Sequence, residues 1–143
     1  MPERQPASPV LDASALLAYL GDELGADVVA EAIAAGASIS AVNLAEALST
    51  LATRGADPAA VVTRLTKRGL LDGAITVEPF TTEDATEAAR PRPLTRSAGL
   101  SLADRACLAL ARRFASEALT ADRAWLELGL DDIHIRSVRP PTP

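Results

Sequence analysis

The sequence has little of three residue types on which active sites often depend: one cysteine, one histidine and 3% aromatic residues. Because Cys107 is alone, neither an intrachain disulfide nor a thiolate metal cluster can form, and we expect it in the core. The single His134 excludes a zinc site built from several histidines. The shortage of rings excludes a platform on which successive nucleic-acid bases stack.

Long hydrophobic runs are also missing. The longest unbroken run has six residues, whereas a helix that spans a bilayer needs about 18 or more. The first nine residues contain three prolines and no apolar stretch typical of a signal peptide. We therefore expect a cytoplasmic protein without a membrane segment.

Positive charge is in short supply. Lys and Arg number 14 against 19 Asp and Glu, so the formal net charge is -5. This balance argues against unaided, non-specific binding to polyanions, and a nucleic-acid partner would need a local basic site. The loop over 90–100 is one candidate, because it contains Arg90, Arg92 and Arg96. These arginines either guide RNA or are simply solvated.

The order of elements predicts an α/β fold. With 143 residues, of which 48% are hydrophobic, the chain is long enough for about one domain. We predict strands over 10–11, 37–41, 74–78, 118–120 and 133–138 and helices over 13–20, 23–35, 42–54, 58–71, 82–89, 101–116 and 123–128. Such alternation favours a parallel sheet with helices on both faces, a three-layer architecture. We expect a flexible lead-in over 1–8, one domain over 9–138 and a proline-rich tail over 139–143.

Four acidic residues stand out by position. Asp12 and Asp122 each follow a short apolar strand, where ligands bind in open parallel sheets. Glu46 lies off the leucine stripe of its helix, and Asp104 is in the first turn of the next long helix. Each has a purely structural interpretation as well. The three aspartates could cap helices, with Ser101 and Asp104 forming a capping box, and Glu46 could be solvated.

Taken together, the four carboxylates indicate a metal site. Carboxylates gathered without a basic partner repel one another unless a cation lies among them. Oxygen-only ligands favour a hard ion such as Mg²⁺ or Mn²⁺, and Mg²⁺ often shares its coordination sphere with substrate phosphate. The pattern therefore predicts phosphodiester hydrolysis assisted by a divalent metal.

The four acidic segments also carry a resemblance to a known family. They are Val10–Ala15, Asn43–Glu46, Gly99–Arg105 and Leu119–Asp122. In their order and spacing the sequence resembles the PIN-domain ribonucleases of the VapC toxin family, over residues 10 to about 138. The resemblance implies a PIN-like fold with a five-stranded parallel sheet, Mg²⁺- or Mn²⁺-dependent endoribonuclease activity on RNA, frequent homodimers and inhibition by a VapB-type antitoxin encoded beside the toxin.

The resemblance also assigns roles to single residues. Asp12, Glu46, Asp104 and Asp122 match the acidic site of the family, with Asp12 and Asp104 as the expected direct metal ligands and the other two acting through water. Ser14 and Thr120 match small hydroxyl positions that hold a carboxylate or a water, unless they are only caps. Arg105 either contacts phosphate or pairs with a neighbouring carboxylate, and we favour the pairing.

Two other functions are alternatives to the toxin. A catalytically silent PIN-fold module would bind proteins and keep its acids only as helix caps. A phosphotransfer receiver or a haloacid-dehalogenase-like phosphatase would need paired acids after the first strand and a lysine near the fourth or fifth. Asp12-Ala-Ser14 and the single Lys67, which lies in a helix, do not supply them. The apolar helices over 23–71 could form a dimer or antitoxin surface, although core packing is the commoner use of such stripes.

Overall fold

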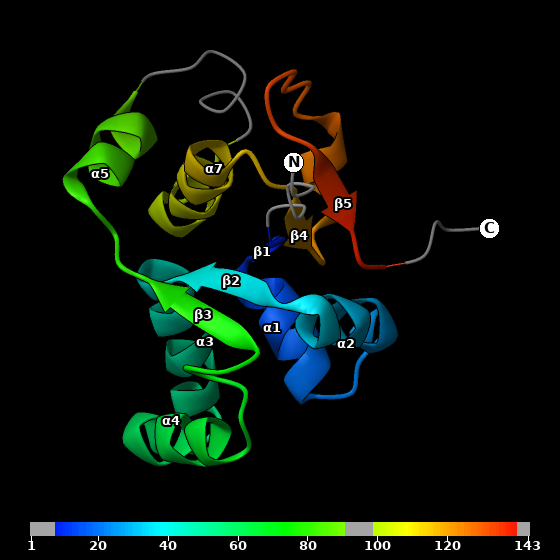
Figure 1. Cartoon of the computed structure of the whole chain (residues 1–143), viewed down its shortest axis with the longest axis vertical. Helices are drawn as coiled ribbons and strands as arrows, with labels where there is room; N and C mark the ends of the chain where they lie inside the picture. The colour runs from blue at the N-terminus through cyan, green and yellow to red at the C-terminus, as the bar shows by residue number, and fades with distance from the viewer. Residues whose placement is uncertain (1–7, 91–98, 140–143) are drawn as a thin grey trace, which may run out of the picture.

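The computed structural model describes residues 8–90 and 99–139 of the chain. Within these ranges five parallel strands form one sheet in the order β3-β2-β1-β4-β5 (Figure 1). The strands are β1 (Val10–Leu11), β2 (Ala37–Ser40), β3 (Ile75–Glu78), β4 (Ala118–Thr120) and β5 (Ile135–Ser137). The central strand β1 is short and wholly buried, and Leu11 pairs with Ile39 on one side and Leu119 on the other.

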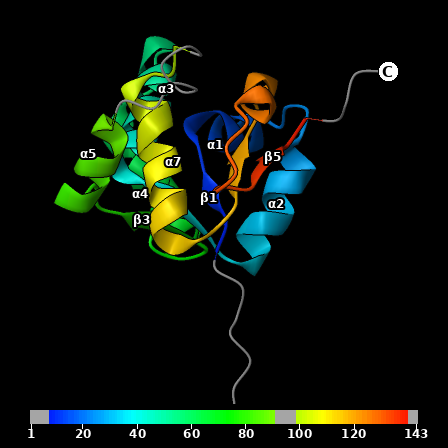
Figure 2. The same cartoon turned by 90° about the horizontal axis from the view of Figure 1, so that it is seen from above.

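Helices cover both faces of this sheet. They are α1 (Ala13–Leu20), α2 (Ala26–Ala35), α3 (Ala41–Thr53), α4 (Pro58–Lys67), α5 (Thr82–Ala89), α7 (Leu102–Phe114) and the 3-10 helix η1 (Arg123–Glu127). Leu11 packs in a core with residues of α1 and α2, whereas Val10 packs with residues of α7. Because successive strand residues face opposite sides, the two cores lie on opposite faces of the sheet (Figures 1 and 2). The predicted three-layer α/β/α fold with a five-stranded parallel sheet is confirmed.

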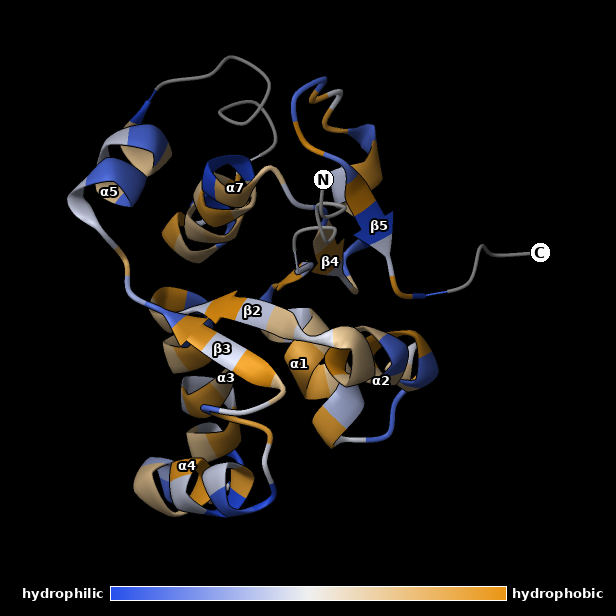
Figure 3. Cartoon of the chain, in the orientation of Figure 1, coloured by the Kyte–Doolittle hydropathy of each residue, from blue (hydrophilic) through white to orange (hydrophobic). Residues whose placement is uncertain are grey.

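Helices α3 and α4 pack against each other as a hairpin. Val61 and Leu65 of α4 are buried in a small core that also includes Leu44, Leu48 and Leu51 of α3. The hydrophobic residues of both helices are visible in Figure 3. Within the described chain, these apolar stripes therefore serve core packing first.

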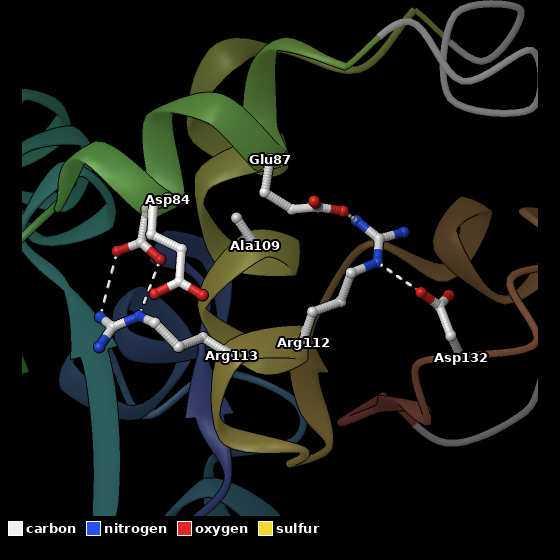
Figure 4. A pocket seen from close by; sticks show the side chains of 7 residues that line it. Asp84, Glu87, Ala109, Arg112, Arg113 and Asp132 are labelled. Carbon is white, nitrogen blue, oxygen red and sulfur yellow. Dashed lines mark hydrogen bonds and ion pairs between the residues drawn. The ribbon is translucent and has the colours of Figure 1, made fainter.

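Charged side chains fasten α5 to α7. Arg113 donates to both carboxylate oxygens of Asp84, at 2.9 and 3.1 Å. Arg112 contacts Asp132 at 2.7 Å and Glu87 at 3.6 Å (Figure 4). Asp84 is buried and also completes a capping box with Thr81 at the start of α5. These contacts hold α5 along the helix that carries Asp104.

The structure corrects several element boundaries. Helix α5 has the predicted bounds, and its cap is Thr81, because the Thr81 hydroxyl accepts the Asp84 N–H. Helix α2 begins at Ala26 rather than near 23, after Gly25 adopts a φ of +96° beside the Val138 carbonyl, where a Cβ would lie 2.5 Å from that oxygen. The last helix is a 3-10 helix, and α4 ends at Lys67, four residues earlier than predicted.

Some predictions fall outside the described residues. Of the loop over 90–100, Arg92 and Arg96 are outside, while Arg90 donates to Glu87 at 3.1 Å. The lead-in over 1–8 and the tail over 139–143 are outside except for Ser8 and Arg139. Within the part of the chain that is described, no helix combines the length and apolar character needed to cross a membrane.

Candidate functional site

Asp12 occupies the turn from β1 into α1. Its carboxylate caps α1 by accepting the Ala15 N–H at 2.8 Å, as the capping interpretation predicts. The residue is only 4% exposed. From β1 the chain continues through α1 and α2 to β2, on one side of β1 in the sheet. From β4, the neighbour of β1 on the other side, it continues through η1 to β5, so the two connections lead in opposite directions. In open parallel sheets this kind of switch point is where ligands bind.

Two hydroxyl groups hold the Asp12 carboxylate. Ser14 Oγ lies 2.7 Å from Asp12 Oδ1 and 2.9 Å from Oδ2, and Thr120 donates to Oδ2 at 2.5 Å. Ser14 in turn accepts the Ala121 N–H at 2.9 Å, and Thr120 accepts the Asp122 N–H at 3.0 Å. Since backbone N–H groups occupy these oxygens as acceptors, the hydroxyl protons are directed at Asp12. The arrangement also fastens the end of β1 to the segment after β4.

Burial raises the pKa of Asp12 to about 6, from an ordinary value of 3.8. The donors from Thr120, Ala15 and Ser14 act in the opposite direction, and the negative charge of Asp104 raises the pKa further. Three donors hold the Asp12 carboxylate in place, yet burial still favours its protonated form. A cation beside this carboxylate would favour the charged form.

Asp104 lies in the first turn of α7, opposite this carboxylate. It forms the predicted capping box, in which Asp104 Oδ2 accepts the Ser101 N–H at 3.0 Å and Ser101 Oγ accepts the Asp104 N–H at 3.1 Å. Capping uses only one of its oxygens. A carboxylate has about four acceptor sites, so a capping carboxylate can bind a cation as well.

Glu46 joins this pair from α3. Its side chain is exposed, and partial burial together with the charge of Asp104 raises its pKa. Asp12, Asp104 and Glu46 also act together on the buried Cys107 thiol, whose pKa they and its burial raise. Asp104 is thus within electrostatic range of both Asp12 and Glu46.

Asn43 ties the helices of Glu46 and Asp104 together, a role that the sequence pattern did not predict. Its side chain is 1% exposed, and Nδ2 donates to the Ala103 carbonyl at 2.9 Å. Asn43 Oδ1 is buried and has no hydrogen-bond partner among the described residues. A polar residue three positions before Glu46, within an otherwise apolar helix start, was the available signal.

Asp122 is connected to Asp12 by the Thr120 hydroxyl. Its side chain is exposed and caps η1, with Oδ1 accepting the Ala124 N–H at 3.0 Å. Its backbone N–H binds the same Thr120 hydroxyl that donates to Asp12.

Among the described residues, Arg105 does not form the carboxylate pair that we favoured. Its Nη1 donates to the Ala88 carbonyl at 2.8 Å, at the end of α5. A carbonyl at the end of a helix carries partial negative charge and accepts such a donor well. In the described structure, Arg105 therefore fastens α5 to the start of α7.

The donor set fits a hard cation that keeps most of its water. Within residues 8–90 and 99–139, no three His, Cys, Asp or Glu side chains are close enough to hold one metal ion. Mg²⁺, however, is commonly bound by one or two carboxylates and completes its coordination with water and phosphate. Among the ion pairs of these residues, none involves Asp12, Glu46, Asp104 or Asp122. A two-carboxylate site without a competing cation matches that requirement.

Solved structures from three organisms have a similar fold. A toxin–antitoxin complex from Klebsiella pneumoniae aligns with a TM-score of 0.64 at 15% identity, over 92% of this chain and 98% of that chain. VapBC2 from Rickettsia felis, bound to a DNA fragment from its promoter, aligns with a TM-score of 0.65 at 13% identity, over 90% and 96%. FitAcB from Neisseria gonorrhoeae aligns with a TM-score of 0.58 at 17% identity, over 90% and 96%.

Sequence comparison is consistent with these likenesses of fold. No curated protein matches the chain. The PIN domain family matches residues 10–129, which is most of the chain and includes all four acids. The chain therefore belongs to the PIN domain family.

Proposed function

We propose that this protein is a divalent-metal-dependent endoribonuclease, the toxin of a type II toxin–antitoxin system. One observation carries the proposal: buried Asp12, held by two hydroxyls, is within electrostatic range of Asp104, and neither carboxylate has a basic partner among the described residues. The family adds support, since PIN domains are typically nucleases. The depression between α5 and α7 is a poorer candidate, because its Arg112 and Arg113 already bind carboxylates (Figure 4).

Each residue of the site has a role that follows from its position. Asp12 and Asp104 would hold Mg²⁺ or Mn²⁺ directly, with Glu46 and Asp122 acting through water. When bound, the ion would stabilise the negative charge that develops on the phosphate oxygens during hydrolysis. Ser14 and Thr120 orient Asp12 and, through the Ala121 and Asp122 amides, fix its distance from η1. Asn43 fixes the helix of Glu46 relative to the turn that carries Asp104.

The partners follow from the same assignment. One of the similar structures, from Klebsiella pneumoniae, is a toxin–antitoxin complex, and another is VapBC2 from Rickettsia felis. These likenesses support a small VapB-type antitoxin as the partner here. RNA as the substrate, a homodimer as the assembly and the cytoplasm as the location belong to the same proposal.

A silent scaffold is the second candidate, because Asp12 and Asp122 are N-caps and Asp104 completes the capping box of Ser101. In that case the acids would serve folding alone, and the protein would act by binding other proteins. Replacing an N-cap aspartate with Asn distinguishes metal binding from helix capping, because Asn caps a helix about as well as Asp.

The direct experiment is cleavage of end-labelled RNAs by purified, antitoxin-free protein with Mg²⁺ or Mn²⁺. We expect discrete cuts that EDTA abolishes and that Asp12→Asn and Asp104→Asn lack. Asp57→Asn is the matched control, since Asp57 caps α4 in the same way, on an exposed turn away from the site. Identical patterns from the wild type and both site variants would support the scaffold instead.

A further inference from the structure

A surface depression adjoins the Asp12 site on the side of β5. It has a volume of about 380 Å³ and is lined by Ser14, Ala121, Asp122, Arg123, Ala124 and Arg139. Ser14 belongs to both places, because its hydroxyl donates to Asp12 and its oxygen accepts the Ala121 N–H. The depression is therefore continuous with the carboxylates.

The surroundings of Asp12 differ on its two sides. Toward β2 lie α3 and α7 with Glu46 and Asp104, whose charges act on each other, and the α7 residue Arg105 donates to the Ala88 carbonyl. Toward β4 and β5 the depression is lined by Arg123 and Arg139 together with Asp122, in a chain whose net charge is -5. If one phosphate of a polyanion lies at the carboxylates, the next phosphate along the chain would thus lie toward β5.

Arg139 is suited to that contact. Its backbone N–H is held by Ser137 Oγ at 3.3 Å, which fixes where the side chain begins. The side chain is exposed, and among the described residues it forms no ion pair. Arg105, Arg112 and Arg113, in contrast, all donate to oxygens of the protein. A guanidinium group binds phosphate through two parallel N–H donors.

We propose that this depression binds the phosphate next to the scissile bond of a single-stranded RNA, with Arg139 and Arg123 as its ligands. The inference rests on the proposed function, and it assigns the direction in which the RNA leaves the carboxylates. It also gives an acidic protein the local basic site that binding a polyanion requires.

The test measures binding of short, fluorescein-labelled single-stranded RNA by anisotropy across a salt series. All variants carry Asp12→Asn, so that cleavage does not interfere. Adding Arg139→Gln should weaken binding and reduce the slope of log K against log salt by about 0.7 for each phosphate that is no longer neutralised. Arg139→Lys, which keeps the charge but not the fork of donors, should restore most of the slope and only part of the affinity.

Arg136→Gln is the matched control. Arg136 lies three residues away, pairs with Glu117 at 3.7 Å and lines a different depression beside Pro9 and Gly36. An affinity and slope for Arg139→Gln and Arg123→Gln equal to those of Arg136→Gln would overturn the inference. Circular dichroism melts of each variant check that it remains folded, so that a change in affinity reflects the arginine side chain and not unfolding.

The two proposals fail separately. If wild-type protein cleaves RNA but Arg139→Gln binds RNA as the control does, the depression is not the phosphate site and the nuclease assignment stands. If wild-type protein does not cleave RNA but binding still depends on Arg139, the phosphate site stands and the nuclease assignment falls.

Discussion

The Thr120 hydroxyl donates to Asp12 Oδ2 at 2.5 Å, across 108 positions of sequence. Thr120 Oγ1 also accepts the Asp122 N–H, so one buried threonine connects two acids that follow different strands. Asp12 thereby has a fixed orientation without any basic side chain. Removing or ionising a member of this small network has consequences that can be measured.

Replacing Thr120 with valine removes the hydroxyl and keeps the shape. The Asp122 N–H and one Asp12 oxygen are then without their partner in a buried place, which should lower the free energy of unfolding by about 1–3 kcal/mol. The pKa of Asp12 should rise further, because the largest influence that lowers it is gone. Urea denaturation and carboxyl NMR titration would measure both effects. Thr120→Ser keeps the donor, and effects as large as those of the valine variant would contradict this role of the hydroxyl.

The stability of the metal-free protein should fall as pH rises from about 4 through 6. Folded Asp12 keeps its proton up to a pKa of about 6, whereas the unfolded chain releases it near 3.8, so the folded state binds more protons between these values. This contribution is present below about pH 4 and is lost above 6. It amounts to about 3 kcal/mol, because one pKa unit corresponds to about 1.4 kcal/mol.

Urea melts of wild type and Asp12→Asn over this pH range isolate that effect, since all other groups are shared. The wild-type curve should fall relative to the variant by up to the stated amount. Parallel curves would show that the Asp12 pKa is not raised.

Divalent ions should stabilise the wild-type protein. At a metal concentration of about 100 times Kd, the expected gain is about 2.7 kcal/mol, seen as a higher Tm with Mg²⁺ or Mn²⁺. Asp12→Asn and Asp104→Asn should lose this gain while their metal-free stability holds or rises, because repulsion between the two charges is relieved. The capping control Asp57→Asn should keep the gain. Equal shifts in all four proteins would indicate that the aspartates are caps only.

Replacing Asn43 with alanine should weaken the metal response out of proportion to its effect on folding. The hydrogen bond to Ala103 is worth about 1 kcal/mol, but it also fixes Asp104 relative to Glu46. Ser40→Ala is a suitable control, because Ser40 caps the same helix and its removal also costs about 1 kcal/mol. We expect a smaller metal-induced Tm shift for Asn43→Ala than for Ser40→Ala. Equal shifts would mean that Asn43 serves packing alone.

Local signals predicted most of the elements, and their errors were local too. The sequence indicates Asp12 and Ser101 as capping residues, because a cap acts within three residues of itself. Thr81 and Thr82 offer the same hydroxyl one position apart, and only the reciprocal contact with Asp84 decides between them. The start of α2 depends on Gly25, which lies against Val138 from the other end of the chain.

The sequence by itself determined the order of strands and helices and placed three acids at strand ends and helix starts and Glu46 within a helix, because propensity, capping and apolar periodicity act over a few residues. Only the tertiary structure decided that Ser14 and Thr120 both donate to Asp12, that Asn43 reaches Ala103, and that Arg105 binds a carbonyl instead of a carboxylate. The last three contacts join residues 108, 60 and 17 positions apart. Such partners are chosen by how the layers pack, which no local pattern records.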